Sequence, residues 1–431
     1  AVVAGRGNNG GDALVAARFL DEFALSVTLL GRPETITTDI ARENWDALVA
    51  AEYDARVVRD SRDFDLRDPD VVVDAMLGTG VTGALREPER TAAAAINGAD
   101  ATVVAVDVPS GVDADTGETA GVAVDADHVV TFHDAKPGLD SLDAAVTVAD
   151  IGIPETAERF AGPGDRRLLS RPSDAHKGAF GEVLVVGGGP YTGAPALAAQ
   201  AAMRAGADLV RVACPRAVAR EVQSFEEGLI LRPFDGDHLT TESLDHVRAL
   251  AADHDAVVFG PGLGDDAATL AAVRDFLADY EGRAVIDADA LQVVPDVETD
   301  ATLVCTPHQG ELVDMGGPSE SEWRDRMAAV EEFASDIGHA VLVKGAYDIV
   351  TDGETTRVNR TGNPGMTVGG TGDVLAGATG ALLSVQDPVH AGALGAYANG
   401  LAGDAAVEEN GYGLLASDLL TRLPRALYHD D

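Results

Sequence analysis

Short apolar runs alternate with helical patterns along almost the whole chain, which has 431 residues. Such alternation is typical of βαβ units, in which helices join parallel strands and cover the faces of the sheet. The expected strands are residues 2–4, 26–30, 71–75, 101–106, 126–132, 182–186, 209–213, 256–260, 283–286, 301–306 and 340–343, and the expected helices of the second half are residues 194–205, 270–277, 324–335 and 374–383. The pattern therefore predicts an α/β protein with predominantly parallel sheets.

The alternation is interrupted once, at residues 154–178, where Pro, Gly, Arg and Asp cluster without periodicity. A chain of this length is also too long for one ordinary hydrophobic core. We therefore expect two layered α/β domains, at residues 1–160 and 168–431. Because the chain begins with Ala1 inside an apolar strand pattern, we expect that the natural protein has further residues before it.

The charge balance is strongly acidic, with 72 Asp and Glu against 31 Lys and Arg and a net charge of −41. Such repulsion argues against nucleic-acid and anionic-membrane partners. Acidic residues are spread over the whole chain, as on proteins adapted to high salt, where charges are screened within about 3 Å at 1 M. No apolar run reaches the roughly 18 residues of a membrane span, and Cys214 and Cys305 suggest no disulfide framework. We expect a halophilic, cytoplasmic protein.

The segment 361–377 is the richest in chemical information. Five of its glycines (Gly362, Gly365, Gly369, Gly370 and Gly372) precede the helical run. Backbone N–H groups at a helix N-terminus favour a bound phosphate. The one carboxylate there, Asp373, would repel a phosphate, so we expect it to act as a base toward a hydroxyl group. The alternative is a tight glycine turn with a carboxylate at the helix start, although five glycines exceed what a turn requires.

Lysine is rare, and Lys136, Lys177 and Lys344 are the only three in the sequence. Each precedes glycine or Pro-Gly, where an ammonium group beside open backbone suits a phosphate contact. With 48 glycines in the chain, this spacing also has a chance explanation.

Three expected strand ends of the first half carry polar loops: Asn8–Asp12, Asp74–Gly80 and Asp107–Asp113. Oxygens of Asn9, Asp74 and Ser110 would suit a hard cation, or each side chain would cap a helix. Residues 5–10 also match G-x-G-x-x-G, so a dinucleotide-binding Rossmann fold is a further interpretation. The second strand lacks the ribose-binding acid, but Arg32 follows it and would suit a 2′-phosphate.

These motifs resemble a known pair of domains. Asn-Asn-Gly-Gly-Asp, Asp-Ala-Met-Leu-Gly-Thr-Gly and Asp-Val-Pro-Ser-Gly-Val are similar to the NAD(P)H-hydrate epimerase domain, which is Rossmann-like. The second half resembles the ribokinase-like ADP-dependent NAD(P)H-hydrate dehydratase in Lys-Gly-Ala-Phe-Gly at 177, Gly-Pro-Gly-Leu-Gly at 260, Thr-Pro-His-Gln-Gly-Glu at 306, Lys-Gly at 344, and Thr-Gly-Asn-Pro-Gly-Met with Gly-Gly-Thr-Gly-Asp at 361–373. The order is that of the bifunctional repair enzymes.

For the first domain, the resemblance implies epimerisation of the R and S hydrates of NADH and NADPH. Substrate would be held by Asn8, Asn9, Gly10, Gly11, Asp12, Gly78, Thr79, Gly80, Val81, Thr82, Gly83 and Asp107. Potassium (K⁺) would be bound by Asn9, Asp74 and Ser110. Asp107 would transfer the proton. Lys136 would neutralise a substrate phosphate or lie at the surface of a strand end.

For the second domain, the resemblance implies ADP-dependent dehydration of the S hydrate to NAD(P)H, AMP and phosphate. Asp373 would be the catalytic base, and Ala194, Gly264, His308 and Asp373 would contact the hydrate. The adenine nucleotide would be bound by Lys344, Gly345, Ala346, Tyr347, Asp348 and Gly372. Asp287 and Asp289 would hold Mg²⁺ through water or cap the next helix, and His308 has the alternative of a packed or capping residue.

Two other functions fit parts of the sequence. A ribokinase-like small-molecule kinase would use the same glycine loop and base, and a non-catalytic module would bind adenine nucleotides without reaction. The epimerase-like first half disfavours the kinase, and the presence of both Asp373 and Lys344 disfavours the module. Both domains of the resembled family usually self-associate, so a homo-oligomer is expected.

Overall fold

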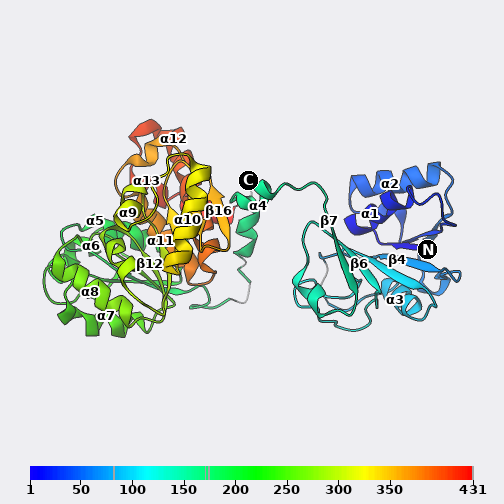
Figure 1. Cartoon of the computed structure of the whole chain (residues 1–431), viewed down its shortest axis with the longest axis horizontal. Coiled ribbons are helices and arrows are strands. Elements are labelled where there is room, and N and C mark those ends of the chain that lie inside the picture. Colours follow the sequence, from blue (N-terminus) through cyan, green and yellow to red (C-terminus); the bar gives the residue numbers. More distant parts are fainter. Residues whose placement is uncertain (81–82, 170, 173–174, 430–431) are drawn as a thin grey trace. The chain divides into compact units, whose positions relative to one another are not determined.

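The computed structural model describes residues 1–80, 83–169, 171–172 and 175–429 (Figure 1). The chain forms two compact units, Ala1–Pro154 and Glu155–Asp431. Residues 155–167, which straddle the border expected from the sequence, belong to the second unit. Val81 and Thr82 of the expected substrate loop lie outside the described residues. None of the described helices combines the length and the apolar character needed to cross a membrane.

The first unit is built on a seven-stranded sheet with the order β3-β2-β1-β4-β5-β6-β7, in which every pairing is parallel. Its strands are β1 (Val2–Ala4), β2 (Val27–Leu30), β3 (Ala55–Val58), β4 (Val71–Ala75), β5 (Thr102–Val106), β6 (His128–Phe132) and β7 (Ala145–Ala149). The strand order reverses between β1 and β4. Ligands of such sheets bind beyond the carboxyl ends of the strands at this reversal.

Helices cover both faces of this sheet. α1 (Asn8–Ala17) and α2 (Asp39–Ala50) lie on one face and α3 (Glu89–Asn97) on the other (Figure 1). Alternation along the strands explains the two layers, because neighbouring residues of a strand point to opposite faces. In β1, Val2 packs in the cluster that contains α1 and α2, whereas Val3 packs with α3. The unit is therefore a three-layer α/β fold with a Rossmann-like strand order.

The second unit has a nine-stranded sheet, ordered β10-β9-β8-β11-β12-β13-β14-β15-β16. Its strands are β8 (Glu182–Val186), β9 (Leu209–Ala213), β10 (Ile230–Leu231), β11 (Ala256–Phe259), β12 (Arg283–Ile286), β13 (Thr302–Cys305), β14 (Ala340–Val343), β15 (Asp348–Thr351) and β16 (Thr356–Asn359). The pairings are parallel from β10 to β14, and the last three strands are antiparallel. The short β14–β15 connection is thus placed at the same edge as the ends of β12 and β13.

The helices of the second unit are α4 (Glu155–Arg159), α5 (Gly193–Arg204), α6 (Ala219–Gln223), α7 (Leu244–Ala251), α8 (Ala267–Ala278), α9 (Gln309–Asp314), α10 (Trp323–Ile337), α11 (Thr371–Leu383), α12 (Pro388–Asn410), α13 (Ala416–Leu420) and α14 (Leu423–Tyr428). α5, α11 and α12 pack on one face of the sheet, whereas α7 and α8 pack on the other. Small residues let α11 lie very close to α5. A Cβ on Gly377 would be only 2.0 Å from the carbonyl oxygen of Ala198.

The predicted fold class, α/β with two domains that are each built in layers, is confirmed. Every expected strand is present, with ends that differ by at most two residues. The prediction missed β3, β7, β10, β15 and β16. β10 has only two residues, β7 is an exposed edge strand, and the β15–β16 hairpin lies in polar sequence. The helix expected from Val374 begins at Thr371, which brings Asp373 into its first turn.

Candidate active sites

The N-terminus of α11 is shaped by a left-handed glycine. Gly370 is the N-cap residue, with φ of 98°, a conformation that L side chains rarely adopt. The hydroxyl of Thr371 donates to the carbonyl oxygens of Met366 (2.8 Å) and Val368 (3.1 Å), which ties the helix start to the glycine loop. No side chain caps the helix. Its first N–H groups are thus available to an anion, as the sequence predicted.

A cavity of about 750 Å³ opens beside this helix start. It is lined by His308, Lys344, Gly345, Ala346, Asp348, Thr361, Gly362, Asn363, Pro364, Met366, Thr367, Val368, Gly369, Gly370, Thr371, Gly372, Leu375, Ala396, Asn399 and Gly400. The glycine segment and the nucleotide residues predicted from the sequence, apart from Tyr347, therefore share one cavity. Asp373 is not among the lining residues but is half-buried one residue beyond them.

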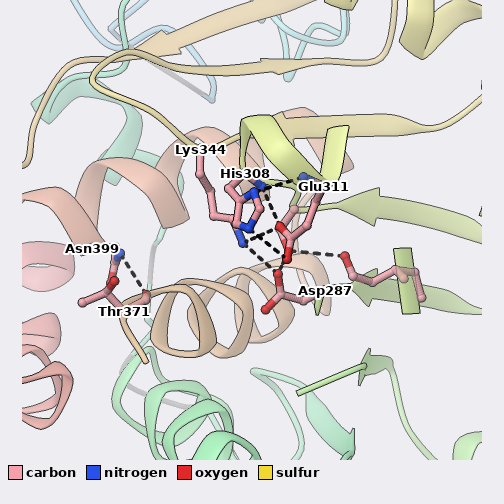
Figure 2. A network of polar contacts seen from close by, with 8 residues as sticks. Asp287, His308, Glu311, Lys344, Thr371 and Asn399 are labelled. Carbon is pink, nitrogen blue, oxygen red and sulfur yellow. Dashed lines mark hydrogen bonds and ion pairs between the residues drawn. The ribbon is translucent and has the colours of Figure 1, made fainter. Parts of the chain in front are cut away.

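A network of charges lies at one end of the cavity (Figure 2). Nζ of Lys344 lies 3.0 Å from Oδ1 of Asp287 and 3.5 Å from Oε2 of Glu311. Burial alone would lower the pKa of Lys344, but the two carboxylates outweigh it and the pKa is raised. The hydroxyl of Thr306 also donates to Oδ1 of Asp287 (2.8 Å). Lys344 is thus a fixed cation at the end of β14.

His308 and Glu311 form a capping box at the start of α9. The Nδ1 atom of His308 accepts from the N–H of Glu311 (3.0 Å), and Oε2 of Glu311 accepts from the N–H of His308 (2.7 Å). The capping interpretation of His308 is therefore confirmed. Because Nδ1 accepts, a neutral ring carries its proton on Nε2. The exposed ring lines the cavity, and its Nε2 atom lies 3.6 Å from Oε1 of Glu311.

Asp373 has the electrostatics of a base. Burial raises its pKa to about 7, with a further increase from Asp287 and Glu311 and an opposing effect of Lys344. A carboxyl group with this pKa releases and accepts protons near neutrality, where general-base catalysis is most effective. Lys344 and the N-terminus of α11 supply positive potential close to this carboxyl group.

Of the residues predicted to bind nucleotide, Lys344–Asp348 span the turn from β14 to the start of β15, and Gly372 lies in the first turn of α11. The side chain of Asp348 accepts from the N–H of Gly345 (2.8 Å) and from Nδ2 of Asn359 (2.9 Å). Burial raises the pKa of Asp348 to about 6. The ring of Tyr347 points elsewhere, since it stacks on Trp323 with 4.8 Å between centroids. Asp348 therefore shapes the turn, and only part of the predicted set faces the cavity.

Two predicted substrate residues lie outside this lining. Ala194, at the start of α5, packs beside Gly262, and Gly264 packs against Pro190 with φ of 77°. These two loops contact one another beyond the carboxyl ends of β8 and β11. The cavity beside α11 does not include them.

The sequence prediction missed two polar residues of α12. Nδ2 of Asn399 donates to the carbonyl oxygen of Thr371 (3.4 Å; Figure 2). Asp404 accepts from the N–H of Gly362 (3.0 Å) and from Nδ2 of Asn363 (2.9 Å). Both side chains hold residues of the glycine segment through these hydrogen bonds. The available signal was that they are the two strongly polar residues in the mostly small and apolar stretch 391–407 of this helix.

In the first unit, the three polar loops converge as expected. Oδ1 of Asp74 accepts from the hydroxyl of Ser110 (2.7 Å), and Oδ2 accepts from the N–H of Ser110 (2.8 Å). Nδ2 of Asn9 donates to the carbonyl oxygen of Val106 (2.7 Å), which joins the first loop to the third. The N–H of Leu77 donates to Oγ of Ser110 (3.0 Å). All three loops therefore meet at the point where the strand order reverses.

Two oxygens of this cluster fit a cation. Oδ1 of Asn9 is buried without a hydrogen-bond partner. Burial raises the pKa of Asp74 to about 6, although hydrogen bonds from Ser110 and Met76 oppose the increase. A buried acceptor without a partner and a desolvated carboxylate are both stabilised by a bound cation. The oxygen donors suit a hard ion.

The candidate proton-transfer residue lies beside this cluster. Oδ1 of Asp107 is 3.0 Å from Nζ of Lys136 and accepts from the hydroxyl of Thr131 (3.1 Å). Asp107 adopts a left-handed φ of 69°, which is rare outside glycine. Burial raises the pKa of Asp12, and the Asp107 charge adds to the increase. Lys136 is thus engaged by a site carboxylate and is not a free surface lysine.

Asp287 and Asp289 were expected either to hold Mg²⁺ through water or to cap the next helix. Asp287 is paired with Lys344, and its side chain does not cap the 3-10 helix Ala288–Asp296 that follows. Burial raises the pKa of Asp289, with contributions from Asp265 and Glu311. Within the described ranges, His, Cys, Asp and Glu form no group of three or more that could hold a metal ion.

Family models match both units. The model described as YjeF-related protein N-terminus matches residues 1–138, and the model described as NAD(P)H-hydrate dehydratase matches residues 183–425. A bifunctional NAD(P)H-hydrate repair enzyme Nnr of Methanothermobacter thermautotrophicus is 43% identical over 99% of this chain and 86% of its own length. The chain belongs to this family of repair enzymes. Its relative in Archaeoglobus fulgidus is 44% identical over 99% of this chain and 88% of its own length.

Solved structures agree with the ribokinase-like fold of the dehydratase unit. An ADP/ATP-dependent NAD(P)H-hydrate dehydratase from Bacillus subtilis, co-crystallised with ATP and Mg²⁺, is 26% identical with a TM-score of 0.54, covering 64% of this chain and 98% of that one. A ribokinase-like superfamily protein from Enterococcus faecalis is 25% identical with the same TM-score, covering 61% of this chain and 93% of that one. The family assignment drawn from the sequence motifs is confirmed.

Proposed function

We propose that this chain repairs hydrated NADH and NADPH. The first unit interconverts the R and S hydrates, and the second unit uses ADP to dehydrate the S hydrate, releasing NAD(P)H, AMP and phosphate. The observation that carries the proposal is the Asp373 carboxyl, with its pKa raised to about 7, in the first turn of a helix whose N-terminus faces a cavity. The names of the relatives support it over a kinase that keeps its phosphorylated product.

The reaction of the second unit has two stages. Hydroxide is a poor leaving group, so the substrate hydroxyl first attacks the β-phosphorus of ADP while Asp373 accepts its proton, and AMP departs. The carbon–oxygen bond of the new ester then breaks and phosphate leaves. Loss of a proton from the neighbouring ring carbon restores the dihydronicotinamide double bond. Asp373 is the general base of the first stage.

The charged phosphoryl group is stabilised by groups that are already in place. Gly370, Thr371 and Gly372 line the cavity at the uncapped start of α11, and Lys344 is held by Asp287 and Glu311. Fixed donors and cations of this kind lower the barrier without reorganising during the reaction. The β14–β15 turn beside Lys344 holds the nucleotide. Ala194, Gly264 and the Nε2 side of His308 take the hydrate.

In the first unit, Asp107 moves the proton at the hydrated nicotinamide carbon. The loops at Asn8–Asp12 and at residues 78–83 bind the dinucleotide around it. Lys136 fixes the Asp107 carboxylate through their 3.0 Å ion pair. Asp12 lies close enough for the two charges to interact.

Asn9, Asp74 and Ser110 would hold K⁺, because the unpartnered Oδ1 of Asn9 and the desolvated Asp74 need a positive partner. A bound K⁺ would supply positive charge beside the substrate loops. The described residues of the second unit do not form a matching site for Mg²⁺. We therefore assign Mg²⁺ to the phosphates of the entering ADP and to no reaction step.

The remaining features concern the protein as a whole. We propose a homo-oligomer that acts in the cytoplasm of a salt-adapted cell on small molecules, without nucleic-acid or membrane partners. The net charge of −41 supports both the salt adaptation and the exclusion of anionic partners.

The proposal is tested by turnover of separate R and S hydrates with and without ADP, followed by the absorbance of the restored dihydronicotinamide ring. The S hydrate should be consumed only with ADP, and AMP and phosphate should form in equal amounts. The R hydrate should be consumed with ADP after conversion to S, and Asp107→Asn should block R but not S. A stable phosphorylated product without NAD(P)H would contradict the proposal and favour the kinase.

A further inference from the structure

Three aromatic side chains form a ladder that begins directly after the first unit and ends in the nucleotide turn. The rings of Phe160 and Trp323 lie 6.0 Å apart at 55°, and those of Trp323 and Tyr347 lie 4.8 Å apart at 12°. Tyr347 belongs to the β14–β15 turn that presents Lys344, Gly345 and Ala346 to the cavity. Its ring is absent from the cavity lining, so it anchors the turn from outside.

The first rung is fixed by backbone pairing. Phe160 forms a parallel bridge with Val358 of β16, and the N–H of Ala161 donates to the carbonyl oxygen of Val358 (2.9 Å). Arg357 donates to the carbonyl oxygen of Phe160 (3.3 Å) and to both carboxylate oxygens of Asp165 (2.8 Å each). The segment that follows the first unit thus extends the edge of the nine-stranded sheet.

The second rung is fixed by α10. Trp323 is the first residue of that helix, and the guanidinium carbon of Arg324 lies 4.4 Å from the centre of its ring. One helical turn later, Arg326 donates to the carbonyl oxygen of Tyr347 (3.2 Å) and to Oε1 of Gln309 (3.3 Å). The start of α10 therefore holds both the ring and the backbone of Tyr347.

We propose that Phe160 and Trp323 are positioning residues for ADP, acting through Tyr347 on the β14–β15 turn. The inference rests on the proposed function, because it assumes that this turn binds the nucleotide. Neither ring lines the cavity, so neither touches the reacting atoms. Loss of the ladder frees the turn, and ADP must then order it on binding, which weakens affinity. The phosphoryl-transfer groups at α11 and Asp373 stay in place.

The test measures steady-state kinetics of full-length Trp323→Ala and Phe160→Ala. Aromatic pairs of this kind correspond to about two- to tenfold in affinity. We expect KM for ADP to rise by this factor, while kcat at saturating ADP and KM for the S hydrate stay within about twofold of wild type. Phe225→Ala is the matched control, because Phe225 is an exposed phenylalanine of the same unit that stacks on none of the other aromatic residues in the described part of the chain. If KM for ADP and KM for the S hydrate rise by the same factor and kcat falls as well, the proposal is overturned.

A spectroscopic test is independent of turnover. The chain has two tryptophans, so in Trp45→Phe the fluorescence comes from Trp323 alone. ADP without hydrate should change this emission saturably, and Phe160→Ala should shift the titration to higher ADP. If Trp45→Phe does not fold, the difference between wild type and Trp323→Phe gives the same signal. Unchanged emission at saturating ADP would overturn the proposal, whereas a response to ADP in a protein without hydrate turnover would contradict only the proposed function.

Discussion

Nζ of Lys344 lies 3.0 Å from Oδ1 of Asp287, whose side chain is almost completely buried. Removing the ammonium group leaves that carboxylate without its counter-charge. Breaking a buried ion pair from one side costs about 3–5 kcal/mol, and since Lys344 is partly exposed we expect about 3 kcal/mol for Lys344→Gln. Denaturant unfolding of the second unit should show this loss. Arg220→Gln, which removes the same charge from an exposed position of α6, should change stability little.

The same substitution should also alter the base. Lys344 lowers the pKa of Asp373, against burial and the charges of Asp287 and Glu311. In Lys344→Gln the pKa of Asp373 should therefore rise above about 7. The residual rate should reach its plateau at higher pH than in wild type. A plateau at an unchanged pH would show that Lys344 does not act on Asp373.

Asp373→Asn tests the base directly. General-base catalysis contributes about 10²- to 10⁴-fold, and we expect a loss of kcat in this range for the S hydrate with ADP. In wild type kcat/KM should rise with pH to a plateau above about 7, because only the ionised carboxylate accepts a proton. The residual kcat/KM of the variant should not show this rise with pH. Retention of the full rate would remove Asp373 from the mechanism.

Asp373→Asn should also be more stable than wild type. A carboxyl whose pKa is raised on folding destabilises the folded state once the pH exceeds its unfolded pKa, and the full penalty is reached above its folded pKa. For Asp373 this penalty grows from about pH 4 to about pH 7. The melting temperature of the variant should therefore exceed that of wild type at pH 8 and converge with it near pH 4. A lower melting temperature at pH 8 would contradict the raised pKa.

The sequence was sufficient for the features that depend on local pattern. We could predict the positions of the strands, the glycine segment and the strand-end loops from local sequence alone. Parallel strands bring their carboxyl ends to one edge of a sheet, so the loops after them lie close together. Contacts between residues far apart in the sequence could not be predicted from local pattern. Neither the pairing of Asp287 with Lys344 nor the orientation of the Tyr347 ring toward Trp323 follows from spacing, since the partners are 57 and 24 residues apart.

The short elements show the same limit. The β15–β16 hairpin contains polar positions such as Asp348 and Asn359, whose side chains hydrogen-bond to one another. Because these positions are polar, the sequence pattern did not indicate strands here, although α12 packs on the strand pair. The start of α11 was misplaced because Gly370 and Gly372 have low helix propensity, although the left-handed φ of Gly370 is what initiates the helix.

Asn9 and Asp74 predict a specific effect of K⁺. The unpartnered Oδ1 of Asn9 and the buried Asp74 should be stabilised by K⁺. Replacing NaCl by KCl at constant ionic strength should raise the melting temperature of the first unit. The melting temperature of Asn9→Leu should be the same in NaCl and in KCl. Equal melting temperatures of wild type in both salts would argue against the cation site.

Self-repulsion from the net charge of −41 predicts that folding requires salt. Charges act over about 10 Å at 0.1 M salt but only about 3 Å at 1 M. The melting temperature should therefore rise steeply between about 0.05 M and about 1 M NaCl and level off by about 3 M, where little repulsion remains to be screened. Sucrose is the control, because it favours burial by exclusion from the protein surface without screening charge. A cooperative melt that is unchanged across the salt series would show that the acidic surface does not limit stability.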